Sequence, residues 1–179
     1  MKRIRYIIAL YLLVLVLPEL IAEGSVVNEK APELVISEWI DDDSPGTLEG
    51  MRGNVIVINF FQMKCFGCKT FSIPLMLFWE KRYREREDII FLSIHTVFEH
   101  HQDQAPSLLK EYVRKKGITH PVGVDMFGPG ETIPITMSTF KTGGTPCITI
   151  IDKRGTIRFK QLGNFDVDSA NNLIDKLLR

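Results

Sequence analysis

The sequence predicts an α/β fold in which a central mixed β-sheet is flanked by helices on both faces. Two continuous apolar runs, 55–61 and 89–94, are typical of strands that are buried on both sides of a sheet. Helical patterns follow both runs. Near the C-terminus, a turn at 152–155 joins two further strand patterns as a β-hairpin, which adds antiparallel strands to the sheet.

The first half of the chain alternates short extended pieces with loops before the first long helix. The patterns predict a strand at 34–36, a loop at 41–46, a buried strand at 55–61 and a helix from about Phe66 to Glu85. Pro74 lies inside that helix and should kink it, because proline has no backbone N–H to donate. The charged segment 81–88 is interpreted as the solvated end of the helix, with a partner surface as the alternative.

The second half of the chain continues the alternation of strands and helices. The patterns predict a strand at 89–94, a helix at 105–116 ended by Gly117, an extended piece at 121–125, a short helix at 133–141, strands at 147–151 and 156–160, and a final helix at 166–178. The resulting order of elements, β-α-β-α-β-β-α, supports a mixed sheet covered on both faces.

Length and composition indicate one globular domain. The chain has 179 residues, of which 45% are hydrophobic and 25% are charged. This length suits a single sizeable core, and the composition excludes a disordered chain. Lys plus Arg and Asp plus Glu both number 22, so no nucleic-acid surface is expected.

The N-terminus resembles an export signal. Lys2, Arg3 and Arg5 precede an apolar run, Tyr6 to Leu17, whose 12 residues are too few for a membrane span of about 20. We therefore expect residues 1–24 to be a signal peptide or an N-terminal membrane anchor, and 25–179 to form the domain. The anchor stays open because the apolar character extends to Ala22. The expected location is exported, in the periplasm or elsewhere outside the cytoplasm.

The three cysteines, Cys65, Cys68 and Cys147, are too few for a disulfide-stapled scaffold. Cys65 and Cys68 form a CxxC motif at the predicted strand-to-helix junction. Residues at positions i and i+3 of a helix lie about 5–6 Å apart, within the Cα range of a disulfide. Cys147 is interpreted as a small buried hydrophobe, with a third redox thiol as the alternative.

The position of Cys65 predicts its chemistry. It lies at the start of the helix, where unpaired N–H groups and the helix dipole stabilise a thiolate, and Lys64 adds a cation nearby. Cys65 is therefore the expected nucleophile. Cys68, one turn into the helix, should be more buried and should resolve the mixed disulfide.

Metal and haem sites fit the motif poorly. A structural zinc site needs four ligands, and haem attachment needs a histidine where this chain has Lys69. His95, His100 and His101 are interpreted as part of a solvated loop, with a metal site as the weaker alternative. We therefore expect no metal and no cofactor.

Several motifs together carry a resemblance to a known family. They are Ala31-Pro32-Glu33-Leu34, the strand end Asn59-Phe60-Phe61, the CxxC, Gly144-Thr145-Pro146, the segment 151–157 and Leu162-Gly163. With these motifs the sequence is similar to the TlpA-like branch of the thioredoxin superfamily, from about Ala31 to the C-terminus.

The resemblance implies a thioredoxin fold whose Thr145-Pro146 peptide is cis and packs against the cysteine pair. It also implies substrates that are protein disulfides or small thiols, together with a redox partner that supplies or removes electrons. The expected substrate-contacting residues are Thr145, Pro146, Phe66 and Gly67. The chain departs from the family at Gly67, where proline is common, and at Phe71, where glutamate is common.

The function expected from the sequence is an extracytoplasmic thiol–disulfide oxidoreductase, with the resemblance favouring reduction. One alternative is a thiol peroxidase of peroxiredoxin type, although Gln62 stands where such enzymes usually have threonine. The other alternative is a redox-inert binding module, against which the retained cysteine pair argues.

Overall fold

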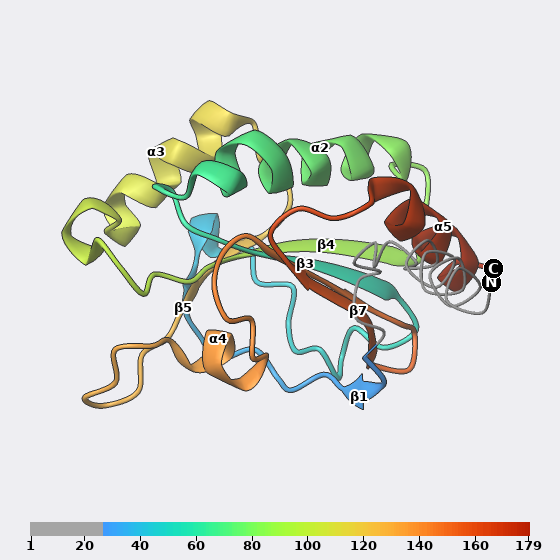
Figure 1. Ribbon diagram of the computed structural model, residues 1–179, viewed down its shortest axis with the longest axis horizontal. Coiled ribbons are helices and arrows are strands. Elements are labelled where there is room, and N and C mark those ends of the chain that lie inside the picture. The colour runs from blue at the N-terminus through green and yellow to red at the C-terminus, as the bar shows by residue number, and fades with distance from the viewer. Residues whose placement is uncertain (1–26) are drawn as a thin grey trace, which may run out of the picture.

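The computed structural model describes residues 27–179, so the predicted signal segment 1–24 lies outside the described residues. The described chain forms a seven-stranded sheet in the order β1-β7-β6-β3-β4-β5-β2 (Figure 1). The strands are β1 (Glu29–Lys30), β2 (Ile36–Trp39), β3 (Val55–Phe61), β4 (Ile89–His95), β5 (Val122–Asp125), β6 (Cys147–Ile151) and β7 (Thr156–Leu162). The β3–β4 and β4–β5 pairs are parallel and the other pairs antiparallel, which confirms the mixed sheet.

Helices cover both faces of the sheet, as predicted. Figure 1 shows α2, α3 and α5 above the sheet and the short α4 below it. The helices are α2 (Ile73–Arg82), α3 (Pro106–Lys116), α4 (Ile135–Thr139) and α5 (Val167–Leu177), with shorter turns η1 (Ile40–Asp42), η2 (Cys68–Ser72) and η3 (His101–Asp103).

Strand β3 lies at the centre of the core, and all seven of its residues are buried. Because successive side chains of a strand point to opposite faces, β3 contributes to both layers. Val55 and Val57 pack in a cluster with residues of α2 and α5. Ile56, Ile58 and Phe60 pack in a second cluster on the other face. This burial on both faces explains the uninterrupted apolar run in the sequence.

The helix after the cysteine motif differs in detail from the predicted one. Its first part, η2, is a π-helical turn in which the N–H of Ile73 donates to the carbonyl of Cys68. Pro74 follows this turn directly, within the first positions of α2. Since proline has no N–H to donate, the wider turn lies where regular α-helical pairing would fail. A π turn therefore precedes Pro74 in the region where the sequence predicted a kink.

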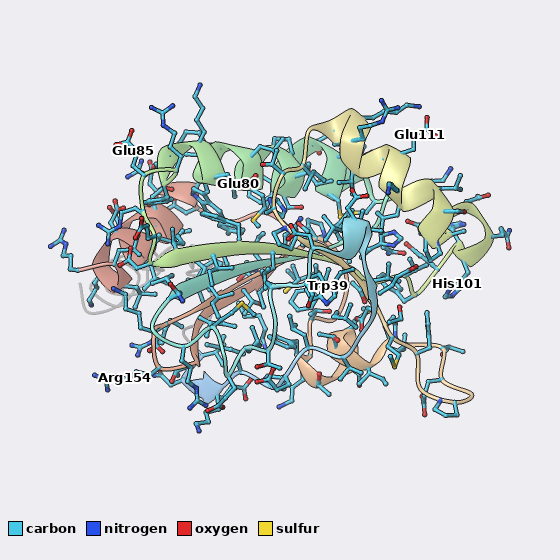
Figure 2. The ribbon with its side chains drawn as sticks, turned by 180° about the vertical axis from the view of Figure 1, so that it is seen from behind. Trp39, Glu80, Glu85, His101, Glu111 and Arg154 are labelled. Atoms are coloured by element: carbon cyan, nitrogen blue, oxygen red, sulfur yellow. A yellow bond between two sulfur atoms is a disulfide. The ribbon has the colours of Figure 1, made fainter. Side chains whose placement is uncertain are left out.

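Helix α2 ends at Arg82 rather than at Glu85. The Arg86 guanidinium donates to the Asp88 carboxylate and to the carbonyl of Leu178, which holds the chain in a turn after the helix. Figure 2 shows Glu85 pointing outward at this end of the molecule, as expected for a solvated segment.

The first predicted strand is displaced along the chain. Strand β2 begins at Ile36, because the N–H of Val35 donates to the Thr136 hydroxyl and its carbonyl accepts from Met126 N and from that same hydroxyl. Strand β1 was not predicted, and the later strands and helices follow the prediction closely. Gly117, for example, ends α3 with φ of +66°, a conformation that glycine adopts easily. Within residues 27–179, no helix is long and apolar enough to cross a membrane.

Candidate active site

The CxxC motif lies where β3 ends and the first helical turn begins. Cys65 and Cys68 form a disulfide with their Cα atoms 5.2 Å apart, within the expected range. The Cys65 N–H donates to the carbonyl of Gln62, which closes a tight turn after the strand. The predicted strand-to-helix placement of the motif is confirmed.

The two cysteines differ in exposure. Cys65 is half-buried, whereas Cys68 is fully buried in a cluster with Phe61, Met63 and Ile73. The backbone N–H of Cys68 points at the Cys65 sulfur, with 3.0 Å between N and Sγ. In the reduced protein, this donor and the helix N-terminus would stabilise negative charge on Cys65. The less buried of the two cysteines is thus also the one whose thiolate the backbone favours.

The Thr145–Pro146 turn lies against the cysteine motif, and its peptide bond is cis, as the resemblance implied. A Cβ atom on Gly67 would lie only 3.0 Å from Cδ of Pro146. Side chains rarely approach this closely, so the proline ring occupies the space that a larger residue at 67 would need. A side chain at position 67 would therefore require the Pro146 ring or the cysteine loop to shift.

Strand register brings these distant segments together. Strand β6 runs antiparallel to β3, and Cys147 pairs with Phe60. The residues just before β6 therefore lie beside those just after β3, at the same end of these two neighbouring strands. Thr145 and Pro146 reach the cysteine motif in this way, although they follow it by about 80 residues in the sequence.

Apolar side chains are exposed beside the disulfide. Phe66, between the two cysteines, is 80% exposed. Leu162, also exposed, covers the loop before Thr145, since a Cβ on Gly144 would lie 3.2 Å from its Cδ1. Lys64, the predicted supporting cation, is exposed next to Cys65. The disulfide therefore lies in a surface that offers apolar contacts to a partner.

Cys147 lies in a different environment. It is buried in the cluster that includes Phe60 and Phe140, on the face of the sheet opposite to the one that Cys68 packs against. Burial raises the pKa of its thiol to about 11. These observations favour the interpretation of Cys147 as a small buried hydrophobe over that of a third redox thiol.

The histidines do not form a metal site in the described part of the chain. No group of three or more His, Cys, Asp or Glu residues in it could hold a metal ion. His95 is buried at the end of β4, so its assignment to a solvated loop was wrong, and burial lowers its pKa to about 4. His101 is exposed and points away from the sheet (Figure 2). The histidines therefore belong to different environments.

Two glutamines near the motif were not identified from the sequence. Gln62 and Gln104 are buried and bonded to each other, with 3.0 Å between Gln104 Nε2 and Gln62 Oε1. Gln62 also donates to the Thr145 hydroxyl, and Gln104 accepts from the backbone N–H of Lys64. A polar residue directly after a buried strand was a signal for Gln62, but the sequence holds no comparable signal for Gln104.

Two solved structures resemble the chain over nearly its whole described length. A thioredoxin-like superfamily protein, SPOA0173, is 39% identical, and the match covers 84% of this chain and 96% of that protein with a TM-score of 0.79. A thiol-disulfide isomerase from Corynebacterium glutamicum is 36% identical, and the match covers 83% and 96% with a TM-score of 0.75.

Curated relatives match less closely. The protein DipZ of Mycobacterium tuberculosis, like that of Mycobacterium bovis, is 25% identical over 151 residues, which is 83% of this chain. The match spans only 20% of DipZ, so this chain corresponds to one part of a much longer protein. No protein-family model matches the chain.

The fold agrees with that of these two solved structures, and this chain carries a CxxC disulfide at a strand-to-helix junction beside a cis-proline turn. Together with identities of 36% and 39% over 96% of each solved protein, they show that the chain belongs to the thioredoxin-like thiol–disulfide oxidoreductases.

Proposed function

We propose that the chain is an extracytoplasmic oxidoreductase that uses Cys65 and Cys68 to exchange disulfides with protein or small thiols, working as a reductase. The Cys68 N–H that points at the half-buried Cys65 sulfur carries this proposal. It supports Cys65 as the attacking thiolate and Cys68 as the resolving thiol.

The proposed reaction has two steps. The Cys65 thiolate attacks one sulfur of a substrate disulfide, so that a mixed disulfide forms and the other substrate sulfur leaves as a thiolate. Cys68 then loses its proton and attacks the Cys65 sulfur, which forms the internal disulfide and releases the second substrate thiolate. Two electrons pass to the substrate, and a redox partner must return two electrons to the pair.

Thr145, Pro146, Phe66 and Gly67 are the proposed substrate contacts. Extended peptides bind free backbone groups as an added strand, and the contact of Pro146 with Gly67 supports the proposal that the neighbouring Thr145 backbone pairs with a substrate in this way. The exposed Phe66 ring, next to Cys65 in the sequence, would add apolar contact area for a substrate. Gly67 leaves the space that the Pro146 ring fills.

The proposed extracytoplasmic location depends on the interpretation of residues 1–24 as a signal peptide or membrane anchor. Residues 25–179 are then the thioredoxin-like domain. A fusion of residues 1–30 to a reporter that is active only outside the cytoplasm should give activity. Replacing Lys2, Arg3 and Arg5 by glutamate should reduce that activity, because the positive n-region would be lost. An inactive fusion retained in the cytosol would contradict the proposed location.

Thiol trapping tests the chemistry. Cys68→Ser should accumulate mixed disulfides with partner proteins, because Cys65 can still attack but nothing resolves the product. Cys65→Ser should accumulate none. In the reduced protein, alkylation at mildly acidic pH should label Cys65 well before Cys68 or Cys147. Trapping by Cys65→Ser instead would reverse the proposed roles, and absence of insulin reduction by the wild-type protein would contradict the reductase assignment.

A further inference from the structure

We propose that Gln62 and Gln104 are positioning residues that fix the Thr145 turn against the cysteine motif and leave the Thr145 hydroxyl proton free to donate to a bound substrate. This inference rests on the proposed function, because it assigns the alignment of substrate to residues that do not react.

The two amides lie inside the protein beside the motif. Gln62 is 1% exposed and Gln104 is 2% exposed. Burying an amide is unfavourable unless its donors and acceptors are paired, so glutamine at two adjoining buried positions requires a specific set of partners. The structure supplies partners from the cysteine loop, from the loop before α3 and from the Thr145 turn.

The partners of Gln104 determine which way its amide faces. Its Nε2 donates to the Glu99 carbonyl and to Gln62 Oε1, at 3.0 Å in both cases. Its Oε1 accepts from the Lys64 N–H at 3.1 Å. Turning the amide over would place its oxygen against two other oxygens and its nitrogen against an N–H donor. Only one orientation of Gln104 therefore satisfies its neighbours.

The orientation of Gln104 in turn determines that of Gln62. Because Gln62 Oε1 must accept from Gln104, its Nε2 faces Thr145 and donates to the hydroxyl oxygen at 3.3 Å. The Thr145 hydroxyl thus acts as an acceptor in this contact, and its own proton remains for another acceptor. Thr145 is partly exposed and precedes the proline that contacts Gly67, so a docked substrate could accept this proton.

The chain of bonds joins segments that are remote in sequence. Gln104 lies 42 residues from Gln62, which in turn lies 83 residues from Thr145. The Lys64 N–H that Gln104 holds belongs to the residue before Cys65. Loss of either amide should therefore loosen the Thr145 turn relative to Cys65, without removing any reacting atom.

A double-mutant cycle tests the chain of bonds. Gln62→Met keeps the length of the side chain but removes its donor, and Thr145→Val removes the hydroxyl while keeping the branched shape. We expect each single variant to reduce kcat/KM for a protein disulfide about tenfold, and the double variant to lose no more than Thr145→Val alone. Additive losses, or an unchanged rate in a folded Gln62→Met protein, would overturn the inference.

Two readouts separate alignment from general damage. The pH profile of Cys65 alkylation should be unchanged in Gln62→Met, because the Cys68 donor and the helix terminus are retained. Gln102→Met is the matched control for Gln104→Met, since Gln102 lies in the same loop but is exposed. The Gln104 variant should lose exchange rate about tenfold, whereas the Gln102 variant should match the wild type. Equal rates in the two variants would contradict the proposal.

Thr145→Ser provides a further test if the Gln62→Met and Gln104→Met proteins do not fold. Serine retains the hydroxyl, so this variant should keep most of the rate that Thr145→Val loses. Equal rates for the folded Thr145→Ser and Thr145→Val proteins would overturn the inference. An inactive wild-type protein would overturn the proposed function itself, which is distinguishable from loss of the glutamine effect alone.

Discussion

Cys65 and Cys147 are close in the fold but differ in almost every property that governs thiol chemistry. Cys147 follows the proline whose ring contacts the cysteine motif. Yet its side chain packs on the opposite face of the sheet, where burial raises the pKa of its thiol to about 11. Cys65 is half-buried, lies at a helix start and accepts a backbone hydrogen bond.

The comparison indicates that proximity does not make a cysteine reactive. Cys147 begins β6 directly after Pro146, so two neighbouring residues lie in different places, one beside the disulfide and one inside the core. Reactivity requires both access and a donor that stabilises the thiolate, and Cys65 alone combines them among the three cysteines of the chain.

The largest effect is expected from removing the proposed nucleophile. Cys65→Ser should reduce disulfide exchange by roughly three orders of magnitude or more, because the reacting thiolate is lost. Insulin reduction coupled to a thiol reductant would measure the loss, with Cys147→Ser as the matched control. A Cys147→Ser protein that lost as much activity would break the contrast between the two sites.

Burial shifts the pKa of His95 as it does that of Cys147, and this shift predicts how the stability of the protein changes in acid. Burial lowers the pKa of His95 to about 4 from 6.5, so between these values the unfolded chain binds more protons than the folded one. The stability contributed by the neutral ring is complete above pH 6.5 and is lost as the pH falls toward 4, by up to about 3 kcal/mol.

Urea unfolding at pH 7 and pH 5 should show this loss in the wild-type protein. His95→Gln should flatten the pH dependence, whereas a substitution of the exposed His101 by glutamine should leave it in place. An unaltered slope in the His95 variant would assign the acid sensitivity to other groups.

Gly67→Ala tests the close contact between the cysteine motif and Pro146. The new methyl group would meet Cδ of Pro146 at 3.0 Å, so either the turn or the cysteine loop must shift. We expect exchange to slow by about tenfold, since catalytic groups are sensitive to displacements of this order. Gly50→Ala, which meets only Thr47 and lies in the loop before β3, is the control. A Gly67→Ala protein as fast as this control would show that the contact does not matter.

The smallest effect is expected at Cys147. Cys147→Ala should leave exchange within about a factor of two and should lower the free energy of unfolding by about 1–2 kcal/mol, through the small cavity created. In the native protein at pH 8, mass spectrometry should find Cys147 unmodified by iodoacetamide, and unfolding in urea should expose it. Rapid native labelling of Cys147 would place it among the accessible thiols.

Local patterns were sufficient for the centre of the fold. The predicted strand 55–61 coincides with β3, since a strand buried on both faces leaves an unbroken apolar run. The cysteine spacing predicted a disulfide-compatible pair at a helix start, and Gly117 marked the end of α3. Each of these features is determined by residues that are close in sequence.

Features that depend on remote contacts were missed or displaced. The strand expected at 34–36 begins two residues later because Val35 bonds to Thr136, about 100 residues away. The bond between Gln62 and Gln104 likewise joins residues 42 apart. No local periodicity marks such pairs, since their positions are decided by how the strands align. The cysteines of the candidate site were thus predictable from their spacing and the proline turn from the family resemblance, but the amides that connect them were not predictable.

The register between β3 and β6 also has a consequence for the order in which the site is assembled. As the chain is synthesised from its N-terminus, Cys65 and Cys68 emerge about 80 residues before Thr145 and Pro146. Contacts between such distant segments form only after a large loop has closed. Until that loop closes, the cysteine pair lacks the contact with the Thr145–Pro146 turn that the folded chain provides. Alignment of Phe60 with Cys147 then brings that turn against the pair.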